Sequence, residues 1–181
     1  MAQIEEILKY NRSFVENNQH VSYISTKYPN KKVAILSCMD TRLTELLPAA
    51  LNLKNGDAKM IKNAGGVITH PFGSVMLSLL VCIYELEVEE IMVIGHCDCG
   101  MEGLDADKMI AKMLDRKISQ EKLNMIKYCG IDIKKWLKGF EDVEISVQDN
   151  VNIIKNHPLV PEDVRVCGFI MDPNTGELTA V

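Results

Sequence analysis

Two short segments of the chain carry side chains that could hold a metal ion. The first segment contains Cys38, and the second contains His96 and Cys99. Thiolate, imidazole and thiolate are ligand types that zinc prefers in tetrahedral geometry. The spacing of His96 and Cys99 lets both side chains reach one ion from a single turn of the chain. Because three protein ligands leave a fourth position open, the set is typical of a catalytic zinc site.

A carboxylate and a guanidinium follow the first cysteine. Asp40 and Arg42 stand two residues apart, so in a turn their side chains can form a bidentate ion pair. Such a pair keeps the carboxylate ionised and aimed. The alternative is an aspartate that caps the next helix beside a surface arginine. The neighbouring metal ligands favour a catalytic role for Asp40 and Arg42.

Predicted strands lead directly into both segments. The apolar run Val33 to Ser37 is typical of a buried parallel strand and ends at Cys38. The run Ile91 to Gly95 leads in the same way into His96. Ligands of open α/β sheets bind outside the carboxyl ends of the strands. We therefore expect the two segments to converge if these strands are neighbours.

The rest of the chain completes an α/β pattern. Further strands are predicted over Ala58 to Lys62 and Val164 to Ile170, and a turn then leads to a short last strand, Glu177 to Val181. Alternating strands and helices imply a mostly parallel sheet of about four strands, helices on both faces and a short antiparallel C-terminal edge strand. The predicted helical segments are Ala2 to Gln19, Leu43 to Leu51 with a possible division at Pro48, Phe72 to Leu86, Asp105 to Leu114, Gln120 to Leu137 and a last one marked by Val143, Val147, Val151 and Ile154.

Length and charge limit the possible functions. The 181 residues predict a single domain, residues 1–181, with an N-terminal helical arm over about residues 2–19 that could lie on its own subunit or on a partner. The net charge of -5 argues against nucleic acid and anionic membranes as partners. The N-terminal residues contain no apolar run of the length of an export signal. The longest apolar stretch, Val75 to Tyr84, is about half as long as a membrane span needs, so we expect a cytoplasmic protein.

One predicted helix has an unusual composition. Pro71 suits the first position of a helix, because its missing N–H is not needed there. The residues from Phe72 to Leu86 are apolar nearly all round. We therefore expect this helix to be deeply buried.

The order and spacing of the motifs resemble the zinc-site signature of the β-class carbonic anhydrases. The resemblance covers at least Val33 to Met101. The motifs that carry it are Cys38-x-Asp40-x-Arg42, Asn63-Ala64-Gly65 and Gly95-His96-x-x-Cys99-Gly100.

The resemblance implies a specific site. Zinc would be bound by Cys38, His96 and Cys99, with Asp40 and Arg42 as a dyad beside it. Zinc-bound hydroxide would convert carbon dioxide reversibly to bicarbonate and a proton. In an alternative form known for the family, the dyad aspartate takes the fourth metal position and the arginine loses its partner.

The resemblance also implies how substrate is held and how subunits assemble. The backbone N–H of Gly100 would help to hold carbon dioxide or bicarbonate. Family members form dimers or multiples of dimers, with the substrate pocket at a subunit interface. We therefore expect a homodimer or a multiple of dimers.

Two other functions remain open. The same zinc site could hydrolyse carbonyl sulfide or carbon disulfide. Alternatively, Cys97-Asp98-Cys99 could belong to a non-catalytic zinc-binding or redox module, which would not need Asp40 or Arg42. Adjacent side chains project differently, so we expect Cys97 to be a bystander to the metal set.

The other cysteines and histidines are predicted to be structural. Buried free thiols usually behave as small core residues. Histidines away from a ligand set are more often solvated or hydrogen-bonding groups than proton shuttles. These residues are Cys82, Cys129 and Cys167, and His20, His70 and His157.

Overall fold

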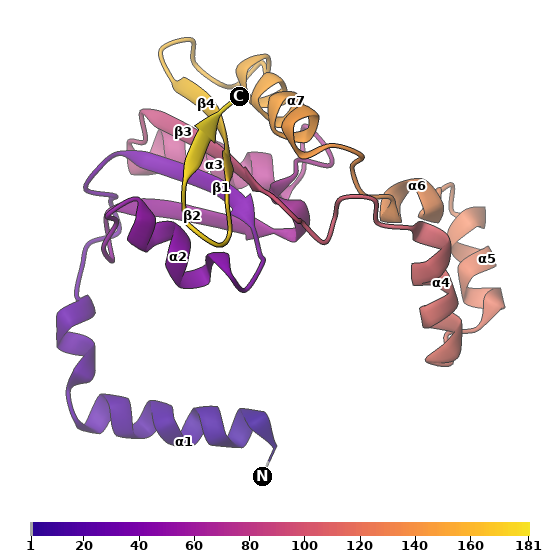
Figure 1. Cartoon of the computed structure of the whole chain (residues 1–181), viewed down its shortest axis with the longest axis horizontal. Coiled ribbons are helices and arrows are strands. Elements are labelled where there is room, and N and C mark those ends of the chain that lie inside the picture. Colours follow the sequence, from indigo (N-terminus) through magenta and orange to yellow (C-terminus); the bar gives the residue numbers. More distant parts are fainter. Residues whose placement is uncertain (1) are drawn as a thin grey trace.

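The computed structural model describes residues 2–181, and Met1, the first residue of the predicted domain, lies outside them. The described residues form a five-stranded sheet in the order β2-β1-β3-β4-β5 (Figure 1). The first four strands in this order run parallel, and β5 pairs antiparallel with β4. The prediction of an α/β fold with an antiparallel C-terminal edge strand is confirmed. The strands are β1 (Val33–Cys38), β2 (Ala58–Asn63), β3 (Glu90–His96), β4 (Arg165–Met171) and β5 (Leu178–Ala180).

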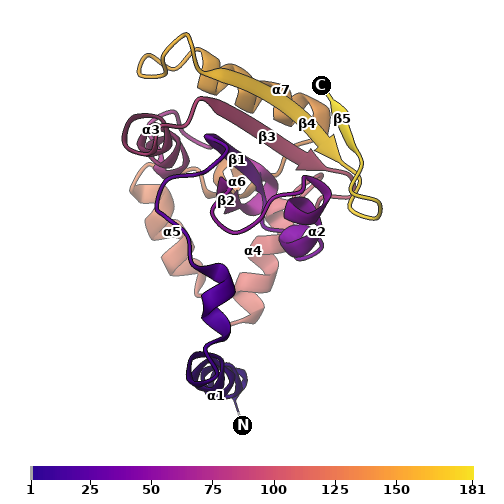
Figure 2. The same cartoon turned by 90° about the vertical axis from the view of Figure 1, so that its left-hand side faces the viewer.

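Helices cover both faces of the sheet, as predicted, and two further groups of helices project from it (Figures 1 and 2). The longest helices begin after extended residues, and α7 is capped by the Asp142 carboxylate, which accepts the Ile145 N–H. The helices are α1 (Gln3–Glu16), α2 (Leu43–Ala50), α3 (Ser74–Leu86), α4 (Ala106–Asp115), α5 (Gln120–Tyr128), α6 (Ile133–Leu137) and α7 (Val143–Lys155), with the short 3₁₀ turns η1 (Gln19–Tyr23) and η2 (Ala64–Gly66).

The sheet has a separate apolar layer on each face. Successive side chains of a strand point to opposite faces, so Leu36 of β1 packs in the layer formed with α3 and α7. Its neighbour Ile35 packs in the other layer, against Leu43 and Leu47 of α2. The helix α2 continues through Pro48 without a division. The hydrogen-bonded strands β1 and β3 therefore lie side by side near the centre of the sheet, with an apolar layer on each face.

The helix α3 differs from its prediction in two ways. It begins at Ser74 after an extended Gly73, so Pro71 lies outside the helix and the prediction for Pro71 is wrong. Its inner residues, among them Met76, are buried, but Leu77 and Tyr84 keep 63% and 61% of their surface exposed. Deep burial on all sides is therefore wrong for the single chain, which covers one face of α3 only.

The segment from Gln120 to Leu137, predicted as one helix, forms two. The break between α5 and α6 lies at Gly130, whose φ of +80° no α-helix can contain. The helix α6 contacts both α4 and α5, and the three helices project from the sheet (Figure 1). Cys129 directly follows α5 on this projecting group and is exposed, so its predicted place in the core is wrong.

The helix α1 lies apart from the sheet, and none of its residues Gln3–Glu16 is buried (Figure 2). Cys82 is buried in α3 as predicted, whereas Cys167 in β4 is only half-buried. No helix within residues 2–181 has the length and apolar character that a membrane crossing requires.

Asn150 ties α7 to the loop that follows η2. Its side chain is buried, accepts a hydrogen bond from the Ile68 N–H at 2.6 Å and donates to the Ser146 carbonyl at 2.6 Å. We expect Asn150→Ala to lower the free energy of unfolding by ~1–3 kcal/mol, because it leaves a buried N–H unpaired. Urea denaturation measures this loss. The exposed Asn152 on the same helix is the control, and a loss for Asn152→Ala equal to that for Asn150→Ala would contradict the assignment.

Candidate metal centre

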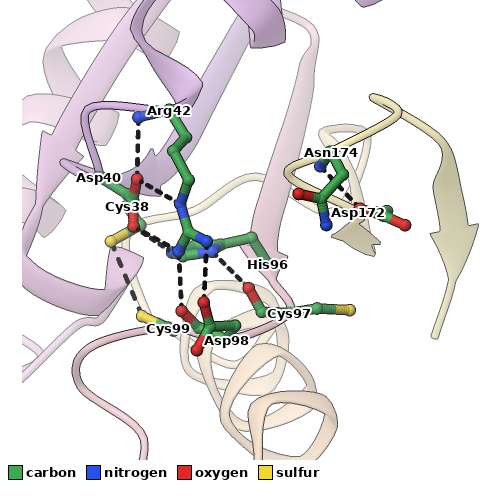
Figure 3. Close-up of polar contacts among 9 residues, drawn as sticks. All are labelled: Cys38, Asp40, Arg42, His96, Cys97, Asp98, Cys99, Asp172 and Asn174. Atoms are coloured by element: carbon green, nitrogen blue, oxygen red, sulfur yellow. Dashed lines mark hydrogen bonds and ion pairs between the residues drawn. The ribbon is translucent and has the colours of Figure 1, made fainter.

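The carboxyl ends of the two central strands bring the predicted ligands together. The strands β1 and β3 are hydrogen-bonded neighbours, with Ser37 opposite Ile94, so Cys38 and His96 end side by side. The chain turns back after His96 and places Cys99 beside them (Figure 3). The ligand atoms of the three side chains all lie within 4.8 Å of one another, and all three residues are buried. The two sulfur atoms are 3.8 Å apart.

His96 has the geometry of a metal ligand. Its Nδ1 lies 2.9 Å from the Cys97 carbonyl oxygen. A carbonyl can only accept, so in the neutral ring, the form that binds metals, Nδ1 carries the proton and the lone pair is on Nε2. Among residues 2–181, this buried Nε2 has no hydrogen-bond partner. Buried polar atoms are rarely left unpaired, so the free lone pair, aimed into a site with two thiols, fits a metal ion.

The two thiols fit the same ion. Burial raises the pKa of the Cys99 thiol to about 11. The Cys99 thiol therefore stays neutral at neutral pH without a cation nearby. A coordinated metal inverts this behaviour, because it deprotonates the thiol and neutralises the resulting charge. The donor set of two sulfur atoms and one imidazole nitrogen suits zinc.

Asp40 and Arg42 form the predicted bidentate pair beside this cluster. Arg42 donates from Nε to Asp40 Oδ1 at 3.0 Å and from Nη2 to Oδ2 at 2.9 Å (Figure 3). These hydrogen bonds lower the pKa of Asp40 to about 2, so the carboxylate is ionised at neutral pH. Asp40 Oδ2 lies 3.8 Å from His96 Nε2, at the edge of the candidate metal position. Arg42, and not Asp40, occupies the N-cap position of α2.

Sequence reasoning missed a second carboxylate on the same arginine. Arg42 Nη1 donates to Asp98 Oδ2 at 2.8 Å, and Nη2 donates to the Asp98 carbonyl at 2.8 Å. Asp98 has a left-handed backbone conformation, with φ of +55°, which aspartate tolerates better than most residues. The one signal in the sequence was the placement of an acidic residue between two candidate ligands.

Two glycines allow close packing around the strand ends. Gly66 has φ of +64°, and a Cβ there would lie 3.0 Å from the Ser37 carbonyl carbon and 3.1 Å from the Cys38 nitrogen. At Gly95, just before His96, a Cβ would lie 2.7 Å from a methyl group of Val147 in α7. A side chain at Gly66 would press on the backbone that carries Cys38, and one at Gly95 would press on the valine side chains of α7 that pack against β3.

The loop between β2 and α3 is held against the end of β1. Asn63 donates to the Val67 carbonyl at 2.7 Å and accepts the Val67 N–H at 2.9 Å, so its side chain closes the loop that contains Gly66. The Asn63 carbonyl accepts the N–H of Met39 at 2.8 Å. This contact fixes the chain between Cys38 and Asp40. The asparagine of the predicted motif therefore has a structural role beside the cluster.

The structure also places the other residues that the sequence singles out. The exposed side chain of Cys97 points away from the cluster (Figure 3). A Cβ at Gly100 would meet no heavy atom of residues 2–181 within 4 Å, so Gly100 borders open space. The buried His157 lies 2.9 Å from the Pro71 carbonyl and accepts the Leu159 N–H, while His20 and His70 are exposed. The role of His157 is thus structural.

The Cys–His–Cys cluster, which could hold a metal ion, lies beside the Asp40–Arg42 pair at the carboxyl edge of the parallel sheet. Residues 33–178 match the family described as "Carbonic anhydrase". The chain belongs to the β-class carbonic anhydrase family.

Individual relatives agree with this assignment. The chain is 51% identical to "Putative carbonic anhydrase YtiB" of Bacillus subtilis (strain 168), over 100% of this chain and 97% of the relative. It is similar to the crystal structure of β-carbonic anhydrase isoform I from Trichomonas vaginalis, with a TM-score of 0.90, 35% identity and coverage of 99% and 97% of the two chains. It is 30% identical to a "Carbon disulfide hydrolase" of Acidithiobacillus thiooxidans, over 82% of this chain and 76% of the relative.

Proposed function

We propose that the protein hydrates carbon dioxide reversibly to bicarbonate and a proton, with zinc held by Cys38, His96 and Cys99. The observation that carries this proposal is the ionised Asp40 carboxylate, fixed by Arg42, 3.8 Å from the free nitrogen of His96. A purely structural metal site needs no ionised carboxylate at its edge. The paired Asp40 and Arg42 also argue against a non-catalytic zinc or redox module.

The chemistry divides between the metal and the chain. Two thiolates and a neutral imidazole balance the charge of Zn²⁺, and bound zinc supplies the Lewis acidity that makes water nucleophilic near neutral pH. Asp40 accepts a hydrogen bond from the attacking water and directs a lone pair at the carbon of carbon dioxide. Arg42 stays protonated throughout, so its role is to hold Asp40.

The released proton and the product have separate partners. Asp40 has a pKa of about 2, so a proton that reaches it passes on to solvent quickly rather than staying. The backbone N–H of Gly100, which borders open space next to Cys99, donates a hydrogen bond to an oxygen of carbon dioxide or bicarbonate. Because Gly100 has no side chain, the substrate can approach its backbone closely.

A second candidate function is hydrolysis of carbon disulfide or carbonyl sulfide. It is favoured by the 30% identity to the carbon disulfide hydrolase of Acidithiobacillus thiooxidans. These substrates are linear molecules like carbon dioxide, and the same nucleophile would attack the central carbon. The 51% identical Bacillus relative carries a carbonic anhydrase name, which makes carbon dioxide the first choice.

Parallel assays on one preparation test the two functions. We expect stopped-flow measurements with zinc-loaded protein to show fast hydration of carbon dioxide, and little hydrogen sulfide release from carbon disulfide or carbonyl sulfide. Zinc content is measured on the same sample. Sulfide release without carbon dioxide hydration would assign the second function, and zinc-loaded protein inactive in every assay would contradict both.

We also propose that two copies of the chain associate through surfaces that one copy leaves uncovered. The helix α1 exposes Ile4, Ile7 and Leu8, and an isolated helix of its length is marginal in water. The outer face of α3 exposes Leu77 and Tyr84. Sedimentation equilibrium of the full chain tests this proposal, and a monomer at micromolar concentration would overturn it. The acidic charge gives no support for a nucleic-acid partner.

A further inference from the structure

Arg42 directs as many side-chain hydrogen bonds to Asp98 as to Asp40. We propose that Asp98 is a positioning residue, which holds the Arg42 guanidinium in the orientation that grips Asp40 and so keeps the Asp40 carboxylate off the metal. The inference rests on the proposed function, because it concerns the same site.

The guanidinium is held at two edges. One edge, formed by Nε and Nη2, donates to both oxygens of Asp40. The other edge, formed by Nη1 and Nη2, donates to the carboxylate and to the backbone carbonyl of Asp98, each at 2.8 Å. A guanidinium is planar, with five donors in a rigid fork. Contacts at two edges therefore fix both its position and its rotation, which Asp40 alone does not do.

The backbone of Asp98 takes part in this clamp. Its left-handed conformation accompanies a carbonyl that faces Arg42, and its neighbour Cys99 is a candidate ligand. Arg42 thus links the turn after β1 to the loop after β3. The two segments that must converge to form the metal site are joined by one side chain, as Figure 3 shows.

Because Asp98 is exposed, its substitution can change the position of Arg42 without a large loss of folding stability. Its side chain keeps 86% of its surface accessible, and exposed ion pairs contribute little to folding stability. Asp98 variants are therefore expected to fold. By contrast, Asp40 Oδ2 is only 3.8 Å from His96 Nε2, so an Asp40 freed by a loosened Arg42 would be close enough to compete with other ligands for a metal held by Cys38, His96 and Cys99.

Three variants distinguish the carboxylate of Asp98 from its backbone and its charge. Asp98→Gly keeps the left-handed backbone and removes the carboxylate. Asp98→Asn keeps an acceptor oxygen for Arg42 and tolerates the same backbone. Glu102→Gln removes a charge from an exposed residue of the same loop that makes no hydrogen bond to Arg42 within residues 2–181, and it serves as the control.

Azide binding to the cobalt(II)-substituted protein, followed by visible absorption, provides a readout that does not depend on turnover. Residues that support a metal site typically change affinity or activity by about 10–100-fold, so we expect Asp98→Gly to bind azide about tenfold more weakly, because Asp40 competes for the open position. Simple loss of a negative charge predicts the opposite, tighter azide binding. Asp98→Asn should lie close to wild type, and Glu102→Gln should match wild type or bind slightly tighter.

The outcomes are distinct. Unchanged or tighter azide binding by Asp98→Gly overturns the proposal, as does equal weakening by Glu102→Gln. In stopped-flow assays, kcat for carbon dioxide hydration should fall with Asp98→Gly by a similar factor and recover largely in Asp98→Asn. If the wild-type protein does not hydrate carbon dioxide, the proposed function fails, while the azide measurements still decide the role of Asp98.

Discussion

Replacement of Asp40 by asparagine is expected to remove most of the carbon dioxide hydration and to leave zinc in place. The carboxylate accepts from Arg42 Nε and Nη2 through its two oxygens, and hydrogen bonding keeps its pKa at about 2. An amide of the same shape has one acceptor oxygen, so one donor of Arg42 then faces an NH₂ group. The charge that orients the attacking water is also lost. Groups that handle protons in this way contribute about 10²–10⁴-fold to rate, and we expect a loss of kcat/KM in that range.

The measurement combines stopped-flow kinetics with metal analysis on the same preparation. Asp115→Asn makes the same chemical change on the exposed end of the projecting helix α4, and it should leave both activity and zinc unchanged. An active Asp40→Asn protein would contradict the role of the carboxylate. Loss of zinc together with activity would show instead that Asp40 contributes to holding the metal.

The convergence of Cys38 and His96 could be predicted because each residue stands at the carboxyl end of a predicted strand. Short apolar runs before Cys38 and His96 mark buried parallel strands, and in the structure these strands are neighbours. The carboxyl edge of a parallel sheet then brings the two segments together. The spacing of Asp40 and Arg42 allowed them to pair, because a turn places residues two apart within reach of each other, and the neighbouring ligand candidates favoured this over a helix cap.

Asp98 could not be predicted, since its contact depends on loop geometry. Asp98 contacts Arg42 from a loop in which residue 98 has a left-handed backbone conformation, and no periodic pattern in the sequence specifies the path of a short loop. Asn150 was missed for a similar reason. Its partner Ile68 is 82 residues away along the chain, so the contact follows from the packing of α7 against a distant loop.

The errors over helices have physical causes of two kinds. An isolated glycine is tolerated within many helices, so the presence of Gly130 alone did not predict the break between α5 and α6. For α3, the apolar composition predicts that all sides of the helix are buried. It does not indicate whether the same chain or a second copy covers each side. The exposed Leu77 and Tyr84 are then consistent with the apolar sequence if a second copy covers that face.

Replacement of Cys38 by alanine is expected to remove the metal itself. Cys38 supplies one of the two sulfur atoms, 3.8 Å apart, that share the cluster with His96. Substitution of residues that only support metal ligands typically costs about 10–100-fold in affinity, so loss of a ligand should cost more. We expect Cys38→Ala to be purified with little zinc and to show no carbon dioxide hydration.

The neighbouring cysteine provides a matched test of which thiols hold the metal. Cys97 is exposed and points away from the cluster, so Cys97→Ser should retain one zinc per chain and its activity. Zinc content is measured by inductively coupled plasma mass spectrometry, and circular dichroism checks that both variants are folded. Zinc retained by a folded Cys38→Ala protein would exclude Cys38 as an essential ligand. Zinc lost from Cys97→Ser would assign Cys97 to the metal, since its side chain has no other described role at this edge of the sheet.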